Sequence, residues 1–189
     1  MLGQPSLSGA GQILLGILVA IAAIFDIRSR RIPNWLVLAG LIAGVGWNVY
    51  ASGVIGKDSG LLRAAEGLGL GFILYFPLYL IRARGAGDVK LLAAAGAIVG
   101  PGNCLWIFLL TAVLGGALAL ILLMFRGRMR KTLFNVGMII EDLMHFRAPY
   151  RSSDELDVRT NKGLRLPHGA MIAVGTLAFL YMARGQVHI

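Results

Sequence analysis

The chain has 189 residues, of which 57% are apolar and 14% are charged, and its net charge is +9. Soluble domains average about 25% charged residues, so this chain has too few charges to cover its apolar surface in water. The same apolar content excludes a disordered chain. A single cysteine excludes an internal disulfide and a Cys-x-x-Cys zinc site. We expect an all-α, polytopic integral membrane helix bundle that forms a single domain over residues 1–189.

Six apolar segments follow one another along the chain and are the expected membrane helices. They run from Leu7 to Phe25, Trp35 to Ile55, Ala64 to Ile81, Val89 to Gly100, Asn103 to Phe125 and Pro167 to Ala183. A bilayer core of about 30 Å needs roughly 17–25 helical residues, and five of the segments reach that length. The segment 89–100 has only 12 residues. It is expected to be a short, tilted or re-entrant element.

The basic residues predict the orientation of these helices. The loops after the first, third and fifth segments hold 15 of the 18 lysines and arginines. Because basic loops stay in the cytoplasm, these loops are predicted to be cytoplasmic and both termini to lie on the other side. A topology without segment 89–100 would divide the basic loops between the two faces. The positive charge thus indicates membrane orientation, and no nucleic-acid partner is expected.

The loop of about residues 126–166 carries a further pattern. A basic cluster, Arg126–Lys131, precedes apolar residues that alternate with polar ones as far as Phe146. This pattern predicts an amphipathic helix on the cytoplasmic leaflet. A linker helix that packs on the bundle is an equal alternative.

Two aspartates stand at the predicted cytoplasmic ends of apolar segments. Asp26 ends the first segment, and Asp88 comes directly before the fourth. A carboxylate at membrane depth is costly, which makes it a candidate functional residue. Because the two lie at similar depth on different helices, we expect them to be able to meet inside the bundle.

Each aspartate also has a purely structural interpretation. Asp88 could cap the helix that follows it, since aspartate accepts backbone hydrogen bonds at helix starts. Asp26 could pair with Arg28 or Arg30 at the water interface. Taken one at a time, these interpretations have about equal weight with the functional ones.

The flanking residues favour function. Pro33 suits the first turn of the second helix, so that a tight connection holds Asp26 near the membrane surface. Gly85 and Gly87 precede Asp88 and permit backbone geometries and close helix approach that a side chain would block. A Gly-x-Gly-Asp motif alone is weak evidence for function. Its position just before an apolar segment, on the same side of the membrane as Asp26, makes the evidence stronger.

Two facing carboxylates have a specific chemistry. Like charges a few ångströms apart cannot both ionise easily, so the pair shares one proton. The ionised member can take a proton from an attacking water, while the protonated member polarises a peptide carbonyl. This is the chemistry of aspartic proteases, and it uses no metal. The three histidines show no metal-ligand spacing. His168 is expected to be a hydrogen-bonded structural residue, and the alternative is that it lies near the site.

Three runs of sequence together resemble the type IV prepilin peptidases, membrane aspartyl proteases of the Gly-x-Gly-Asp class. They are Asp26-Ile-Arg-Ser-Arg-Arg-Ile-Pro-Asn34, Gly85-Ala-Gly-Asp-Val-Lys90 and Leu166-Pro-His-Gly-Ala-Met-Ile-Ala-Val-Gly175. The resemblance implies that Asp26 and Asp88 are catalytic and that no cofactor or metal takes part. It further implies a set of residues that shape the site: Gly85, Gly87, Pro33, Asn34, Lys90, Pro167 and Gly169.

The resemblance also implies a substrate and a place in the cell. Members cleave the short basic leader of a prepilin on the cytoplasmic side of the bacterial inner membrane, just before the hydrophobic pilin helix. The expected partners are therefore the prepilin and membrane lipids, with the oligomeric state left open. Longer members carry a cytoplasmic domain with paired cysteines and methylate the new N-terminus. This chain resembles the short, peptidase-only form of the tight-adherence (Flp-type) pili, so methyl transfer is not expected.

Two other functions are compatible with the sequence. In a small transporter or proton-conducting subunit, Asp26 and Asp88 would bind ions or protons. Such proteins show inverted repeats, and no internal repeat is evident here. A non-catalytic assembly subunit of a secretion machine is the remaining alternative.

Overall fold

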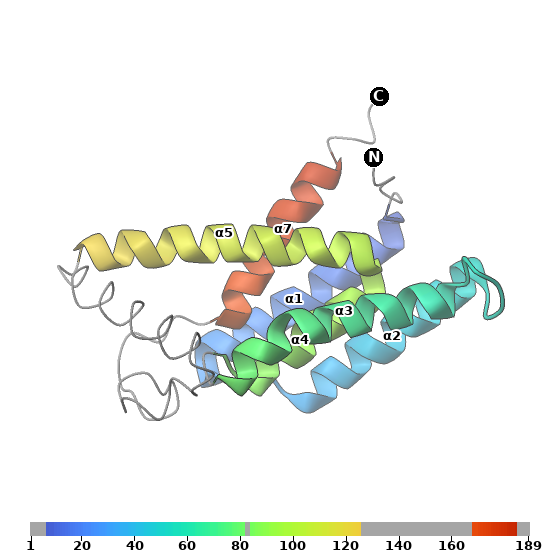
Figure 1. Ribbon diagram of the computed structural model, residues 1–189, viewed down its shortest axis with the longest axis horizontal. Helices are drawn as coiled ribbons and strands as arrows, with labels where there is room; N and C mark the ends of the chain where they lie inside the picture. The colour runs from blue at the N-terminus through green and yellow to red at the C-terminus, as the bar shows by residue number, and fades with distance from the viewer. Residues whose placement is uncertain (1–6, 82–83, 126–167, 185–189) are drawn as a thin grey trace, which may run out of the picture.

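In the part of the chain that the structure describes, all regular structure is helical. The computed structural model describes residues 7–81, 84–125 and 168–184 (Figure 1). The helices are α1 (Gly9–Ser29), α2 (Asn34–Ser52), α3 (Gly60–Leu80), α4 (Ala86–Val99), α5 (Pro101–Phe125) and α7 (His168–Arg184). This confirms the predicted all-α class. The amphipathic helix predicted in residues 126–166 and the site residue Pro167 lie outside the described residues.

Four of these helices are long and apolar enough to cross a membrane. They are α1, α2, α3 and the Pro101–Leu122 part of α5. Helix α4 has 14 residues and is short, as predicted. Helix α7 corresponds to the sixth apolar segment of the sequence. Its 17 described residues stand at the lower end of the range of about 17–25 that crosses a bilayer core.

Local signals in the sequence set the helix ends. The hydroxyls of Ser8 and Ser59 accept hydrogen bonds from the backbone of α1 and α3, and both residues are N-caps. Arg30 ends α1 in the left-handed conformation, with φ 52°. Pro33 is the N-cap of α2, one position before the first turn in which it was expected. Four residues, 30–33, therefore join α1 to α2.

Helix α4 lies in the middle of the bundle. Every residue from Leu91 to Val99 is buried, and α4 packs against α1, α2, α3, α5 and α7. Its approach to α3 depends on glycine, because a Cβ at Gly67 or Gly96 would collide with the backbone oxygen of the other. A short apolar helix is thus enclosed by longer ones, which accounts for its burial on all sides.

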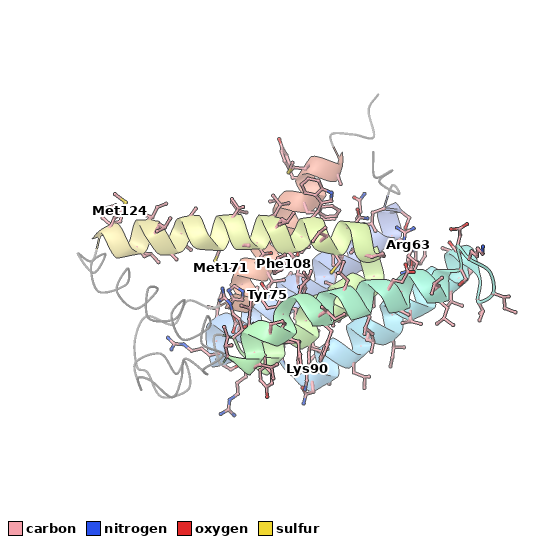
Figure 2. All side chains as sticks on the ribbon, in the orientation of Figure 1. Arg63, Tyr75, Lys90, Phe108, Met124 and Met171 are labelled. Carbon is pink, nitrogen blue, oxygen red and sulfur yellow. The ribbon has the colours of Figure 1, made fainter. Side chains whose placement is uncertain are left out.

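The C-terminal end of α4 is held by polar side chains of its neighbours. The buried amide of Asn48 donates to the carbonyls of Ala97 and Ile98 at 2.9 and 3.0 Å. Arg63 donates to the Val99 carbonyl at 3.4 Å. These contacts pair helix-end carbonyls that have no partner within α4. Figure 2 labels Arg63 at this end and Lys90 near the opposite end of α4.

Helix α7 crosses α5 and packs mainly on α1 and α5 (Figure 1). At the contact with α5, a Cβ on Gly175 would collide with Thr111. This close contact fixes the middle of α7. The N-terminus of α7 lies at the same end of the bundle as the C-terminus of α1, because Gly169 adjoins Asp26 there.

Candidate active site

Asp26 is a buried carboxylate in the last turn of α1. Its side chain is 7% exposed, whereas Arg28 and Arg30 are exposed. The Asp26 backbone carbonyl accepts a hydrogen bond from the amide of Arg30 at 2.9 Å, where α1 ends. The burial of Asp26 away from these arginines counts against the surface ion pair that was the structural alternative.

The first turn of α7 lies directly against Asp26. The amide of Ala170 donates a hydrogen bond to Asp26 Oδ2 at 3.3 Å. A Cβ on Gly169 would stand 3.0 Å from the same oxygen and 3.1 Å from Asp26 Cγ. Only glycine at position 169 leaves this space free for the Asp26 carboxylate. The positive end of the α7 dipole therefore faces a carboxylate, which is a favourable arrangement.

Asp88 is the second buried carboxylate, in the first turn of α4 and outside the four spanning helices. It is 9% exposed. Burial, followed by the negative charge of Asp26, raises the pKa of Asp88 to about 6, while Arg84 and a hydrogen bond from the Gly85 backbone act to lower the pKa. The N-cap of α4 is Gly85 and not Asp88. The carboxylate instead reaches back from the third helical position, as an acidic residue does in a capping box.

These observations place the two carboxylates at one end of the bundle, hereafter the site end. The negative charge of Asp26 contributes, after burial, to the raised pKa of Asp88. The two carboxylates come from α1 and α4, which pack against each other.

The two glycines before Asp88 have different roles. A Cβ on Gly87 would be 3.3 Å from Ile32 Cβ, so this glycine allows α4 to approach the α1–α2 connection closely. A Cβ on Gly85 would meet its nearest neighbour at 3.8 Å, which is an ordinary contact. The φ of Gly85 is −80°. The special backbone geometry expected of these glycines is therefore not used at Gly85.

Three further residues of the predicted set lie at the site end. The ammonium of Lys90 donates to Asn34 Oδ1 at 3.0 Å, which joins α4 to the start of α2. Pro33 precedes Asn34 as the α2 N-cap. Lys90 and Asn34 are exposed. They hold the rim of the site together and do not contact the carboxylates in the way that Gly169 does.

Sequence reasoning missed two residues at the site end and undervalued a third. The ring of Tyr75 is 2% exposed, and its hydroxyl is 2.9 Å from His168 Nε2. The guanidinium of Arg84 is half-buried and interacts electrostatically with Asp88, Tyr75 and His168. Arg84 had been counted only as a topology signal. A tyrosine within an apolar segment gives no signal of its own, whereas His168, flanked by Pro167 and Gly169, gave one that was read as structural.

Metal ligation finds no support among the residues that the structure describes. No group of three or more histidine, cysteine, aspartate or glutamate side chains is gathered there in a way that could hold an ion. The chemistry available from this part of the chain is that of two buried carboxyl groups beside a helix N-terminus.

Comparison with known proteins identifies the family. Residues 13–120 match the type IV leader peptidase family, peptidase family A24, and the chain belongs to this family. A curated relative, the prepilin leader peptidase/N-methyltransferase of Dickeya chrysanthemi, is 36% identical over 104 residues. That alignment covers 53% of this chain and 36% of the relative, so the chain matches little more than a third of that protein. No solved structure matches the chain.

The family match covers one part of the site and not the other. Asp26 and Asp88 both fall within residues 13–120, together with Pro33, Gly85 and Lys90. Helix α7, which supplies Gly169 and the Ala170 amide, lies beyond the matched residues. The contact of α7 with Asp26 is therefore information that the structure adds to the family assignment.

Proposed function

We propose that the chain is a membrane aspartic endopeptidase that cleaves the leader peptide of type IV prepilins, with Asp26 and Asp88 as its catalytic residues. The observation that carries the proposal is the pair of buried carboxylates that the contacting helices α1 and α4 place at one end of a bundle of apolar helices. Membership of the leader peptidase family supplies the reaction class and favours peptidase over transporter.

The surroundings of the two carboxylates differ and suggest different roles. Asp26 accepts a hydrogen bond from the Ala170 amide at the positive end of α7, which suits a group that acts in its ionised form. Burial beside a second carboxylate raises the pKa of Asp88 to about 6, which suits a group that acts in its protonated form. We assign Asp26 as the base and Asp88 as the acid.

With these roles the reaction balances. The oxygen of a water bonds to the peptide carbonyl carbon, one proton of the water passes to Asp26, and Asp88 gives its proton to the carbonyl oxygen. The resulting neutral diol then breaks its C–N bond. The leaving nitrogen takes the proton held by Asp26, and one hydroxyl of the diol returns a proton to Asp88. The products are a carboxylic acid and an amine, and both aspartates recover their starting states.

The proposed substrate is a prepilin whose cleavage site reaches the site end of the bundle. The described basic residues Arg28, Arg31 and Lys90 are exposed there, which supports an orientation with the site on the cytoplasmic side of the bacterial inner membrane. We further propose that the chain is a peptidase-only form serving Flp-type pili. The support for this is the resemblance of the sequence to the short, peptidase-only members of the family. Methyl transfer is not part of the proposal.

Co-expression with a Flp-type prepilin tests the proposed function. Conversion to the shorter mature form is read on a gel, and the new N-terminus is read by mass spectrometry. We expect the wild type to process the prepilin and Asp26→Asn and Asp88→Asn each to leave it unprocessed. Asp58→Asn serves as a matched control, because Asp58 is exposed in the α2–α3 connection at the opposite end. Full processing by either site variant would remove that aspartate from the mechanism.

A further inference from the structure

A part-buried hydrogen bond joins α3 to the first described residue of α7. The hydroxyl of Tyr75 and Nε2 of His168 are 2.9 Å apart, and the ring centroids are 5.7 Å apart. Tyr75 is 2% exposed and also packs edge-on against Phe108 of α5 at 5.6 Å. Figure 2 labels Tyr75 and Phe108 where α3, α5 and α7 come together. Packing therefore holds the tyrosine ring in place independently of its hydrogen bond to the histidine.

This hydrogen bond lies two residues from the contact between α7 and Asp26. His168 begins α7, and the Ala170 amide in the same turn donates to Asp26. The Gly175 contact with Thr111 holds α7 two turns further along. A helix held at its middle can still pivot at its end, so the position of the Ala170 amide depends on what holds His168.

We propose that Tyr75 and His168 form a positioning pair that seats the first turn of α7 on Asp26. The inference rests on the proposed function, because it concerns the geometry of the catalytic carboxylate. Neither side chain is proposed to touch the substrate. Their hydrogen bond keeps the Ala170 amide at bonding distance from Asp26 Oδ2 and keeps Gly169 against the carboxylate.

The electrostatic setting explains why a neutral hydrogen bond serves this purpose. Arg84 interacts with both members of the pair and with Asp88. A protonated imidazole would add a second positive charge beside that guanidinium in a buried site, which is unfavourable. A neutral hydrogen bond between Tyr75 and His168 fixes α7 without changing the charge around the two aspartates. A part-buried hydrogen bond of this kind is also directional.

The test measures kcat and KM for prepilin cleavage by the purified full-length chain. Tyr75→Phe removes only the hydroxyl and keeps the ring contact with Phe108, and His168→Phe keeps a ring without the acceptor. We expect each to lower kcat by roughly 10- to 100-fold with little change in KM, as misplaced supporting groups do. Tyr181→Phe is the matched control on α7, since Tyr181 is 81% exposed, and it should retain the wild-type kcat.

Two further variants separate positioning from folding. The double variant Tyr75→Phe/His168→Phe should be no slower than the slower single variant, because the first change already breaks the shared hydrogen bond. His168→Gln keeps a partner for the hydroxyl and should recover most of the lost kcat. If His168→Phe fails to fold, His168→Gln still decides the question, since a kcat as low as that of Tyr75→Phe would overturn the proposal.

The outcomes also distinguish this inference from the proposed function. Wild-type kcat in both Tyr75→Phe and His168→Phe would reject the positioning pair and leave the peptidase assignment intact. Absence of cleavage by the wild type would instead contradict the proposed function itself. A double variant whose losses multiply would show that the two residues act independently, and would likewise reject the pair.

Discussion

Gly169 and Asp26 lie in direct contact across the α1–α7 interface, where a Cβ on Gly169 would stand 3.0 Å from the Asp26 carboxylate oxygen. The two residues are separated by most of the chain, and each is at the end of its helix. A helix N-terminus is thus packed on a buried carboxylate at the site end. The consequence is that the site depends on α7 as well as on the helices that carry the aspartates.

The first prediction concerns this contact. Gly169→Val should lower kcat for prepilin cleavage by about 10-fold or more, because the side chain pushes α7 away from Asp26 and misplaces the Ala170 amide. The measurement is kcat of the purified protein. Gly116→Val on α5 is the control, since a Cβ there has open space around it. Equal activity of the two variants would show that α7 is not needed at the site.

The second prediction concerns the packing of α3 on α4. Gly67→Ala should lower the free energy of unfolding by about 1–3 kcal/mol, the usual cost of overpacking, since its Cβ collides with the Gly96 backbone. Thermal unfolding in detergent measures the effect. Gly69→Ala on the same helix meets nothing within 4 Å and should leave the unfolding temperature unchanged. A Gly67→Ala variant as stable as the Gly69→Ala control would contradict the close packing.

The third prediction concerns Asp88 and pH. Burial and the charge of Asp26 raise the pKa of Asp88 from 3.8 to about 6. A carboxyl whose pKa is raised on folding favours the folded state below the unfolded pKa, and this contribution is lost as pH rises through the folded value. Asp88→Asn avoids that loss. The variant should be more stable than the wild type above about pH 6, by roughly 3 kcal/mol at most.

Unfolding of the two proteins at several pH values measures this difference. The stability gain of Asp88→Asn over the wild type should grow between about pH 4 and pH 6 and then level off. The variant should nevertheless be inactive in prepilin cleavage. A stability difference that is independent of pH would show that Asp88 keeps an ordinary carboxyl pKa in the folded protein.

Much of the fold was predictable because its signals are local. Long apolar segments define α1, α2, α3 and α5, and Asp26 and Asp88 stand out because charges are rare in such a chain. The shortness of α4 was also readable from 12 apolar residues. The central, enclosed position of α4 could not be predicted, because it depends on which neighbouring helices can approach α4 closely at glycine residues.

The rest of the site depends on contacts between distant residues. Periodicity cannot show that Ala170 donates to Asp26, since the bond is made by a backbone amide that every residue but proline has. The partnership of Tyr75 with His168 joins residues 93 positions apart.

Crosslinking between the two site positions tests the central claim of a shared site most directly. Asp26→Cys and Asp88→Cys are combined in a Cys104→Ala background, with a protease site inserted at the exposed Lys57. After treatment with a short bifunctional thiol reagent and proteolysis, the account predicts that the two fragments remain joined. Asp26→Cys with Gly102→Cys, whose second position lies at the opposite end of the bundle, should release them. Fragments that separate equally in both pairs would contradict a common site for the two carboxylates.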